Sequence, residues 1–250
     1  MSDSNENREG WTGIGKWWWA SAALIAVVVI GIVVVLLLPN PDKSTGTHEP
    51  SGTPDPTPLP SSVAPSPSAA ATGWAEPGCS GSAGSDQVPY EAPETDWEPL
   101  GGSSVPVSET YGPAKVDYPL RQCFQHSPTG ALFAAVTIMT SIGAEPEHAG
   151  AIARASIAPG PGRDEAISQA DGASSSVAQT AAAYRVTSCA PDRCNVDVVF
   201  SISGGQLVRT SLSAVWSGSD WQLDADALEA AGAAAVPQVP AGFTTWSPGR

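Results

Sequence analysis

Basic residues are scarce in this sequence. Its 250 residues include 11 Lys and Arg against 25 Asp and Glu, which gives a formal net charge of −14 at pH 7. Nearly all the excess acid lies beyond residue 38, so the part of the chain that follows the first apolar run is strongly anionic. An anionic surface repels phosphate backbones. We therefore expect no direct binding of nucleic acid.

Motifs for metal binding, covalent catalysis and phosphate binding are also missing. The four cysteines form no CxxC pair and the three histidines do not cluster, which disfavours zinc as an alternative use of the cysteines. The segment 159–163 (Pro-Gly-Pro-Gly-Arg) precedes an expected helix but lacks the Lys-Ser/Thr of a phosphate-binding loop, so it is better explained as a helix breaker. We expect no cofactor and no enzymatic activity.

A few polar and aromatic side chains remain as candidates for a functional site. His126 stands just before an expected helix, but no nucleophile has a suitable spacing from it, so a structural role is favoured over that of a base. His148 is expected to be solvated. Asp224 and Asp226 alternate along an expected strand, where solvation is favoured over cation binding. Three tryptophans either line a cavity or fill the core: Trp97, Trp216 and Trp221.

An uncharged, mostly aliphatic run of 22 residues occupies positions 17–38. As a helix it would rise about 33 Å, enough to cross the apolar core of a bilayer. Lys16, Trp17, Trp18 and Trp19 stand at its start, where indole rings favour the headgroup level and lysine reaches lipid phosphates. The run predicts one transmembrane helix, with these four residues as its interfacial anchor and the lipid bilayer as a partner.

The flanks of this run set the expected orientation. The tail 1–16 carries Arg8 and Lys16, whereas the other flank carries only Lys43, which favours a cytoplasmic N-terminus. A cleaved signal peptide is the main alternative, but the run is too long for one and is followed by Pro-Asn-Pro at 39–41 in place of a small-residue cleavage site. We expect a single-pass protein of the cell membrane whose C-terminal domain is extracytoplasmic.

A linker is expected over residues 39–75. From 39 to 73 the chain is almost entirely Pro, Ser, Thr, Ala, Gly and Asp and has no aromatic residue, so it cannot bury enough apolar surface to offset the entropy of ordering. Its proline content favours polyproline II stretches of about 3.1 Å per residue. We expect this linker to be disordered and to hold the following domain clear of the membrane.

All the cysteines lie beyond the apolar run. An even number of cysteines confined to one side of a membrane is typical of an oxidising compartment. Four cysteines allow three disulfide pairings, and proximity along the chain favours the one that closes the turn at 190–193 and staples the start of the domain to its body. The cysteines concerned are Cys79, Cys123, Cys189 and Cys194.

Helical patterns precede strand patterns in the expected folded domain, 76–250. Ser-Pro at 127–128 is an N-cap followed by proline at the first helical position. Helices are expected at 131–141, 146–156 and 163–170, followed by strands at 184–189, 195–202, 207–216 and 221–226. This order predicts an α+β domain in which helices pack on one face of an antiparallel sheet.

Three sequence segments resemble an actinobacterial family of membrane-anchored proteins of unknown function that is associated with conjugative and integrative elements. They are 95–98 (TDWE), 111–117 (YGPAKVD) and above all 123–132 (CFQHSPTGAL), and the resemblance extends from about residue 95 to the C-terminus. The order of elements is similar to the cone-shaped nuclear transport factor 2-like fold of type IV secretion assembly factors. The resemblance implies about three helices on a curved antiparallel sheet.

It also implies a function. Together with the absence of catalytic motifs, the resemblance predicts a non-enzymatic scaffold or assembly subunit of a conjugative transfer apparatus, with protein partners in the cell envelope and self-association left open. The alternative is an anchored small-ligand-binding, hydrolytic or isomerase domain that uses the pocket of the cone. That alternative requires a closed, polar-lined cavity with convergent titratable groups.

Overall fold

The computed structural model describes residues 73–75, 78–82 and 84–249, all within one compact unit, Pro65–Arg250. The expected tail 1–16, membrane helix 17–38 with its anchor residues, and most of the linker 39–75 lie outside the described residues. Among the helices that are described, none is long and apolar enough to cross a membrane.

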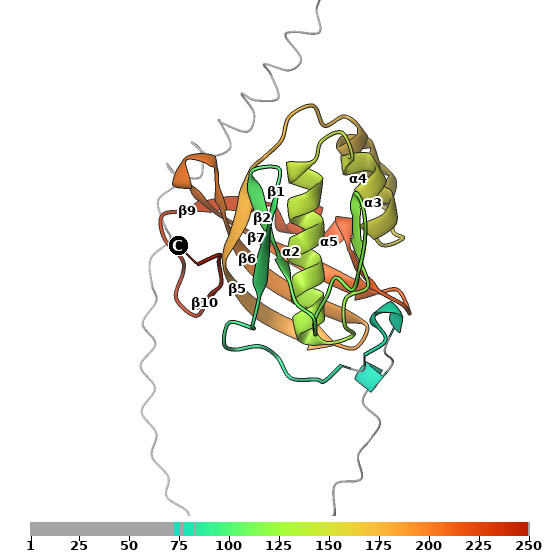
Figure 1. Cartoon of the computed structure of the whole chain (residues 1–250). Coiled ribbons are helices and arrows are strands. Elements are labelled where there is room, and N and C mark those ends of the chain that lie inside the picture. The colour runs from blue at the N-terminus through green and yellow to red at the C-terminus, as the bar shows by residue number, and fades with distance from the viewer. Residues whose placement is uncertain (1–72, 76–77, 83, 250) are drawn as a thin grey trace, which may run out of the picture. The chain divides into compact units, whose positions relative to one another are not determined.

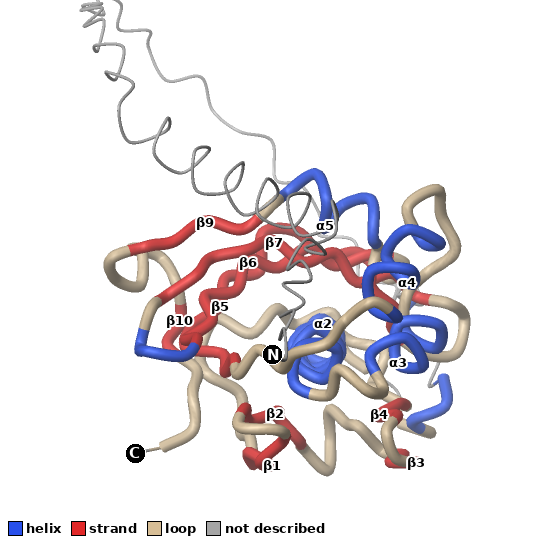
Figure 2. Tube along the Cα trace, turned by 90° about the horizontal axis from the view of Figure 1, so that it is seen from above, coloured by secondary structure: helices blue, strands red, loops and turns tan. Residues whose placement is uncertain are grey.

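An eight-stranded sheet curls into a half-barrel, with β1 and β2 on the opposite side of α2 from β6 and β7 (Figures 1 and 2). Its main path is β1-β2-β5-β6-β7-β8, with β10 paired to β5 and β9 paired to β7. Every pairing is antiparallel except that of β2 with β5, which is parallel. The strands are β1 (Asp96–Leu100), β2 (Ser103–Val107), β5 (Gln179–Ala190), β6 (Arg193–Ile202), β7 (Leu207–Trp216), β8 (Trp221–Leu223), β9 (Ala233–Val236) and β10 (Thr244–Thr245).

Helix α2 (Pro128–Ala144) lies inside the curl of the sheet (Figure 2). Its start follows the sequence signal, because the Ser127 side chain accepts a hydrogen bond from the Gly130 amide and Pro128 occupies the first turn. Nearly all of α2 is buried. The other helices are α3 (Ala149–Ser156), α4 (Arg163–Asp171) and α5 (Ala225–Ala231), and a separate hairpin is formed by β3 (Lys115–Asp117) and β4 (Leu120–Gln122).

The expected fold, a nuclear transport factor 2-like cone of about three helices on an antiparallel sheet, is wrong. Four strands precede the helices, two of them in the large sheet, that sheet is mixed, and a fourth helix, α5, follows β8. Strands β1 and β2 were missed because each contains a proline, Pro99 and Pro106, which counts against strand structure in a sequence. The two are joined at Gly101 and Gly102, whose φ values of 53° and 83° suit glycine.

The last expected strand, 221–226, also needs correction. Strand β8 ends at Leu223, and Asp224 becomes the N-cap of α5 by accepting a hydrogen bond from the Ala227 amide. A side chain that caps a helix competes with strand extension at the same backbone. The expected helices and the remaining strands overlap observed elements, although α3 begins three residues after the expected 146 and β5 begins five residues before the expected 184.

The core fills the space between α2 and the concave face of the sheet. Val196, Val198 and Phe200 alternate along β6, and all three belong to this core. Trp74 belongs to it as well, with 5% of its surface exposed, although the sequence placed it in the linker. The folded domain therefore includes residues upstream of 76. Other large members are Phe124, Leu132, Phe133, Tyr184, Leu212, Trp221 and Trp246.

A buried carboxylate links three strands on the convex side of the sheet. Asp197 on β6 accepts hydrogen bonds from Arg185 on β5 and from Arg209 and Ser211 on β7. Burial opposes ionisation of Asp197, but the hydrogen bonds from Ser211 and Arg185 and the charge of Arg209 outweigh it and hold its pKa below the ordinary value. The ring of Phe243 lies beside both guanidinium groups.

We predict that Asp197→Asn lowers the free energy of unfolding at neutral pH by about 1–2 kcal/mol, because two half-exposed arginines lose a shared ionic partner. A lowered pKa stabilises the fold above the unfolded-state value of about 3.9, and this contribution disappears as pH falls through the folded-state pKa. Urea titrations at pH 7 and pH 3 check the prediction. The difference between wild type and variant should shrink at pH 3, while exposed Asp117→Asn changes little at either pH.

Candidate functional site

Residues 73–75 and 78–82 pack against the rest of the domain, and we call this contact the clasp. His126 is buried and stacks flat on Trp216, with ring centroids 3.8 Å apart and planes 7° apart. Trp74 packs on the other rings, 5.1 Å from His126 and 6.1 Å from Trp221. The His126 Nε2 atom lies 2.6 Å from the Pro191 carbonyl oxygen. This packing suits the structural role that the sequence favoured for His126.

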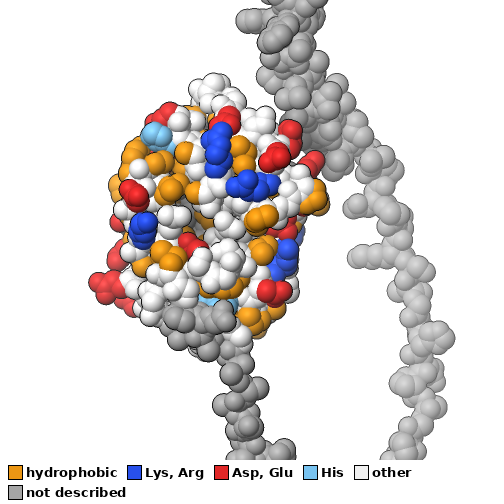
Figure 3. All heavy atoms as spheres, turned by 90° about the vertical axis from the view of Figure 1, so that its right-hand side faces the viewer, with side chains coloured by type: hydrophobic (Ala, Val, Ile, Leu, Met, Phe, Trp, Pro, Cys, Tyr) orange, Lys and Arg blue, Asp and Glu red, His pale blue; other side chains and the backbone are white. Residues whose placement is uncertain are grey.

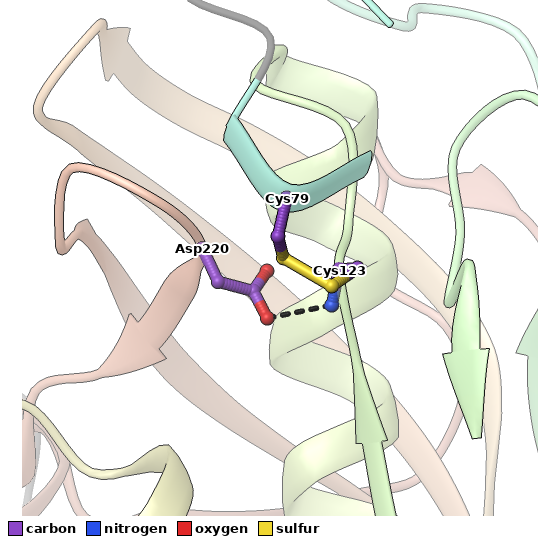
Figure 4. Close-up of side chains that lie close together, drawn as sticks. All are labelled: Cys79, Cys123 and Asp220. Carbon is purple, nitrogen blue, oxygen red and sulfur yellow. Dashed lines mark hydrogen bonds between the residues drawn. A yellow bond between two sulfur atoms is a disulfide. The ribbon is translucent and has the colours of Figure 1, made fainter. Parts of the chain in front are cut away.

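A disulfide between Cys79 and Cys123 closes the clasp (Figure 4). The carboxylate of Asp220, in the turn between β7 and β8, accepts hydrogen bonds from the backbone N–H groups of Cys123 and Phe124 at 2.7 and 2.9 Å. The Cys79 amide donates to the Ser219 carbonyl in the same turn. Three segments far apart in the sequence are thus joined at one point.

The position of Asp220 in the clasp shifts the pKa of its carboxyl group. Burial raises its pKa, and the N–H groups of Cys123, Phe124 and Trp221 lower it without cancelling the effect of burial. The two sulfurs and this carboxylate lie within 4.8 Å of one another, a spacing that also suits a metal ion. Because the sulfurs are bonded to each other, neither is a thiolate, so these residues do not fit zinc.

The second disulfide joins Cys189 and Cys194, which face each other across the β5–β6 hairpin with Cα atoms 4.1 Å apart. The pairing favoured by proximity is therefore confirmed. No cysteine of the described residues is free.

The other polar candidates have local structural roles. Asp224 caps α5 and pairs with Arg193 at 2.5 Å, while Asp226 accepts a hydrogen bond from the Gly162 amide. The loop before α4 thus already has a carboxylate partner from the protein itself. His148 precedes α3 and packs edge-on against the ring of Tyr118.

The three candidate tryptophans do not come together. Trp216 and Trp221 belong to the clasp, with centroids 5.3 Å apart, whereas Trp97 on β1 packs against Trp246. Neither group lines the cavities described below.

Three neighbouring hollows lie around α5. They have volumes of about 300, 290 and 170 Å³, and all three are lined by Leu228. We call this surface the α5 groove. It was not predicted because its lining comes from many separate segments between Met139 and Ala233, which only the folded chain brings together. Met139 and Ile142, which stand three positions apart near the end of α2, are partly exposed although most of this helix is buried.

A larger hollow of about 490 Å³ lies at the start of α2, bordered by loop residues 85–93, Tyr111, Ser127 and Thr129. Its lining contains one carboxylate, Glu91, and no histidine, cysteine or lysine. The α5 groove is lined mainly by apolar side chains, with two carboxylates, two amides and the hydroxyl groups of Ser175 and Thr210. Within the described residues, neither hollow brings a nucleophile and a base together.

The face shown in Figure 3, which carries α3 and α4, has apolar, acidic and basic side chains interspersed. Two of the arginines on α3 and α4 interact with other groups of the domain. Arg154 pairs with Asp171, and the Arg163 guanidinium donates to the backbone carbonyls of Ile157 and Arg154.

Fold and site together define a class of protein. It is a domain with two disulfides and a curled mixed sheet around one central helix. It also has an apolar groove and an N-terminal segment attached by the clasp. Residues 58–245 match the family described as domain of unknown function DUF8175, and the chain belongs to this family. No curated protein and no solved structure matches the chain.

Proposed function

We propose that the chain is a non-enzymatic envelope protein, anchored in the membrane by residues 17–38, that presents its folded domain outside the cytoplasm as an assembly subunit. The observation that carries this proposal is the pair of disulfides, because disulfides form and persist in oxidising compartments and are rare in the cytosol. The uncharged run that precedes them is long enough for a membrane anchor.

The clasp supports the tethered arrangement. It attaches the start of the domain to the core a few residues after the Pro/Ser-rich segment. Tension in a linker would act on the domain at this point. An apolar groove without a nucleophile and base suits binding better than catalysis. We further propose that the complex served is a conjugative transfer apparatus, a step supported by the resemblance of segments 95–132 alone.

Labelling in intact cells tests the topology. We predict that a membrane-impermeant maleimide labels Asp117→Cys, on the exposed β3, and does not label Ser4→Cys in the N-terminal tail, because only the former side of the chain is exported. Both variants should be labelled to the same extent after the cells are lysed. A protected Asp117→Cys, or a labelled Ser4→Cys, would reject the proposed orientation.

The assembly role is tested by crosslinking in cells followed by purification of the full chain from membranes. Recovery of secretion-channel or transfer proteins is the expected result. Recovery of envelope proteins of another kind would retain the anchored assembly role and reject the conjugative one.

A further inference from the structure

The α5 groove exposes large apolar side chains that a domain of this size would normally bury. Met139 and Ile142 are the partly exposed large residues of the buried helix α2, and Val177 has 49% of its surface exposed. Opposite them lie Ile202 and Val208 of the sheet and Leu228 of α5. A continuous apolar surface of this kind, bordered by polar residues, is typical of a binding site.

Helix α5 lies in the groove but does not fill it. Helix α5 has only seven residues, and none of them is buried. Its Leu228 side chain lines both the hollow of about 300 Å³ and that of about 290 Å³. One leucine side chain leaves open space on both sides of itself. The shape therefore suits a further helix that presents several apolar residues at helical spacing, as in helix-in-groove recognition.

The charge at the rim selects the partner. Glu165 of α4 and Glu229 of α5 are exposed and border the groove, and among the described residues that line it none is Lys or Arg. Nearby, Arg154 pairs with Asp171, whereas Arg163 donates to backbone carbonyl groups and keeps one positive charge against the two glutamates. The rim is thus net negative, which attracts cationic partners and repels the phosphates of anionic lipids.

We propose that the α5 groove binds an amphipathic helix of a partner protein, with apolar residues on one face and Lys or Arg flanking them. This inference rests on the proposed assembly function and specifies the chemistry of its contact. Apolar burial in the two hollows provides the contact area, and the acidic rim excludes acidic helices.

Photo-crosslinking of the full-length chain in detergent tests the inference. The probe is a designed peptide with leucines at positions i, i+3, i+4 and i+7, lysines elsewhere and a photoreactive group on the apolar face. A matched peptide carries glutamate at every lysine position. Crosslinked residues are mapped by mass spectrometry, so that adsorption to micelles does not count as binding.

We expect the lysine peptide to crosslink to residues of the groove and the glutamate peptide to fail. Glu165→Lys combined with Glu229→Lys should weaken binding about tenfold, because two favourable contacts become repulsive. Glu109→Lys combined with Asp117→Lys, equally exposed and outside the groove, should have no effect. Circular dichroism confirms that both double variants are folded.

Equal crosslinking by the two peptides, or crosslinks scattered over the surface, would overturn the inference. Preferential labelling of the groove by a photoreactive phosphatidylglycerol would overturn it in favour of a lipid. These results leave the labelling experiment on orientation unaffected, so failure of the groove and failure of the anchored topology are distinguishable.

Discussion

Replacing Cys79 and Cys123 together by serine is expected to lower the free energy of unfolding by about 4 kcal/mol. The disulfide closes a loop across a sequence separation of 44 residues, and the entropy that a loop of this length gains in the unfolded chain corresponds to about 4 kcal/mol at 25 °C. Denaturant titration of the full-length chain, followed by far-ultraviolet circular dichroism, measures the change.

The second disulfide provides a matched control. Cys189 and Cys194 are five residues apart, so their replacement by serine is expected to cost about 2 kcal/mol by the same entropic argument. The ratio of the two effects is more informative than either value, because both variants exchange two cysteines for two serines. A larger loss from the short hairpin disulfide would show that the clasp disulfide does not restrain the fold.

Local signals predicted most of the helices and strands. The Ser127-Pro128 start of α2, the alternation of Val196, Val198 and Phe200, and the facing cysteines of the β5–β6 hairpin all depend on neighbours within a few residues. Such features can be inferred from one sequence because each element is specified by its own segment.

The features that were missed depend on long-range contacts. The parallel pairing of β2 with β5 joins Ser104 to Thr180, and no local pattern encodes it. It makes the sheet mixed and excludes the expected cone. Trp74 was assigned to a linker because its neighbours in sequence are small and polar, whereas its neighbours in space are His126 and Trp221.

Clasp and groove lie toward opposite ends of the central helix. His126 directly precedes the N-terminal cap of α2, and Ile142 lies in its last turn, about 24 Å further along if the rise is 1.5 Å per residue. The chain is therefore attached near one end of α2, and the apolar groove lies near the other. A tethered domain built in this way can bind at the groove without displacing its own attachment.

Trp74→Ala is expected to lower the free energy of unfolding by about 3–5 kcal/mol, the range for removal of a large aromatic side chain from a core. The indole is buried against His126 and Trp221, so its loss leaves a cavity within the clasp. Urea titration followed by circular dichroism measures the loss. Tyr90→Ala is the control, because Tyr90 is 82% exposed and its removal should change stability by less than about 0.5 kcal/mol.

The two large predictions are coupled, and the coupling tests the clasp directly. If the disulfide and Trp74 hold the same segment, then serine at Cys79 and Cys123 already weakens that attachment, and Trp74→Ala should cost less in this background than in the wild type. Additive losses would mean that Trp74 stays in the core without the disulfide. A Trp74→Ala effect as small as that of Tyr90→Ala would show that residues 73–75 belong to the linker after all.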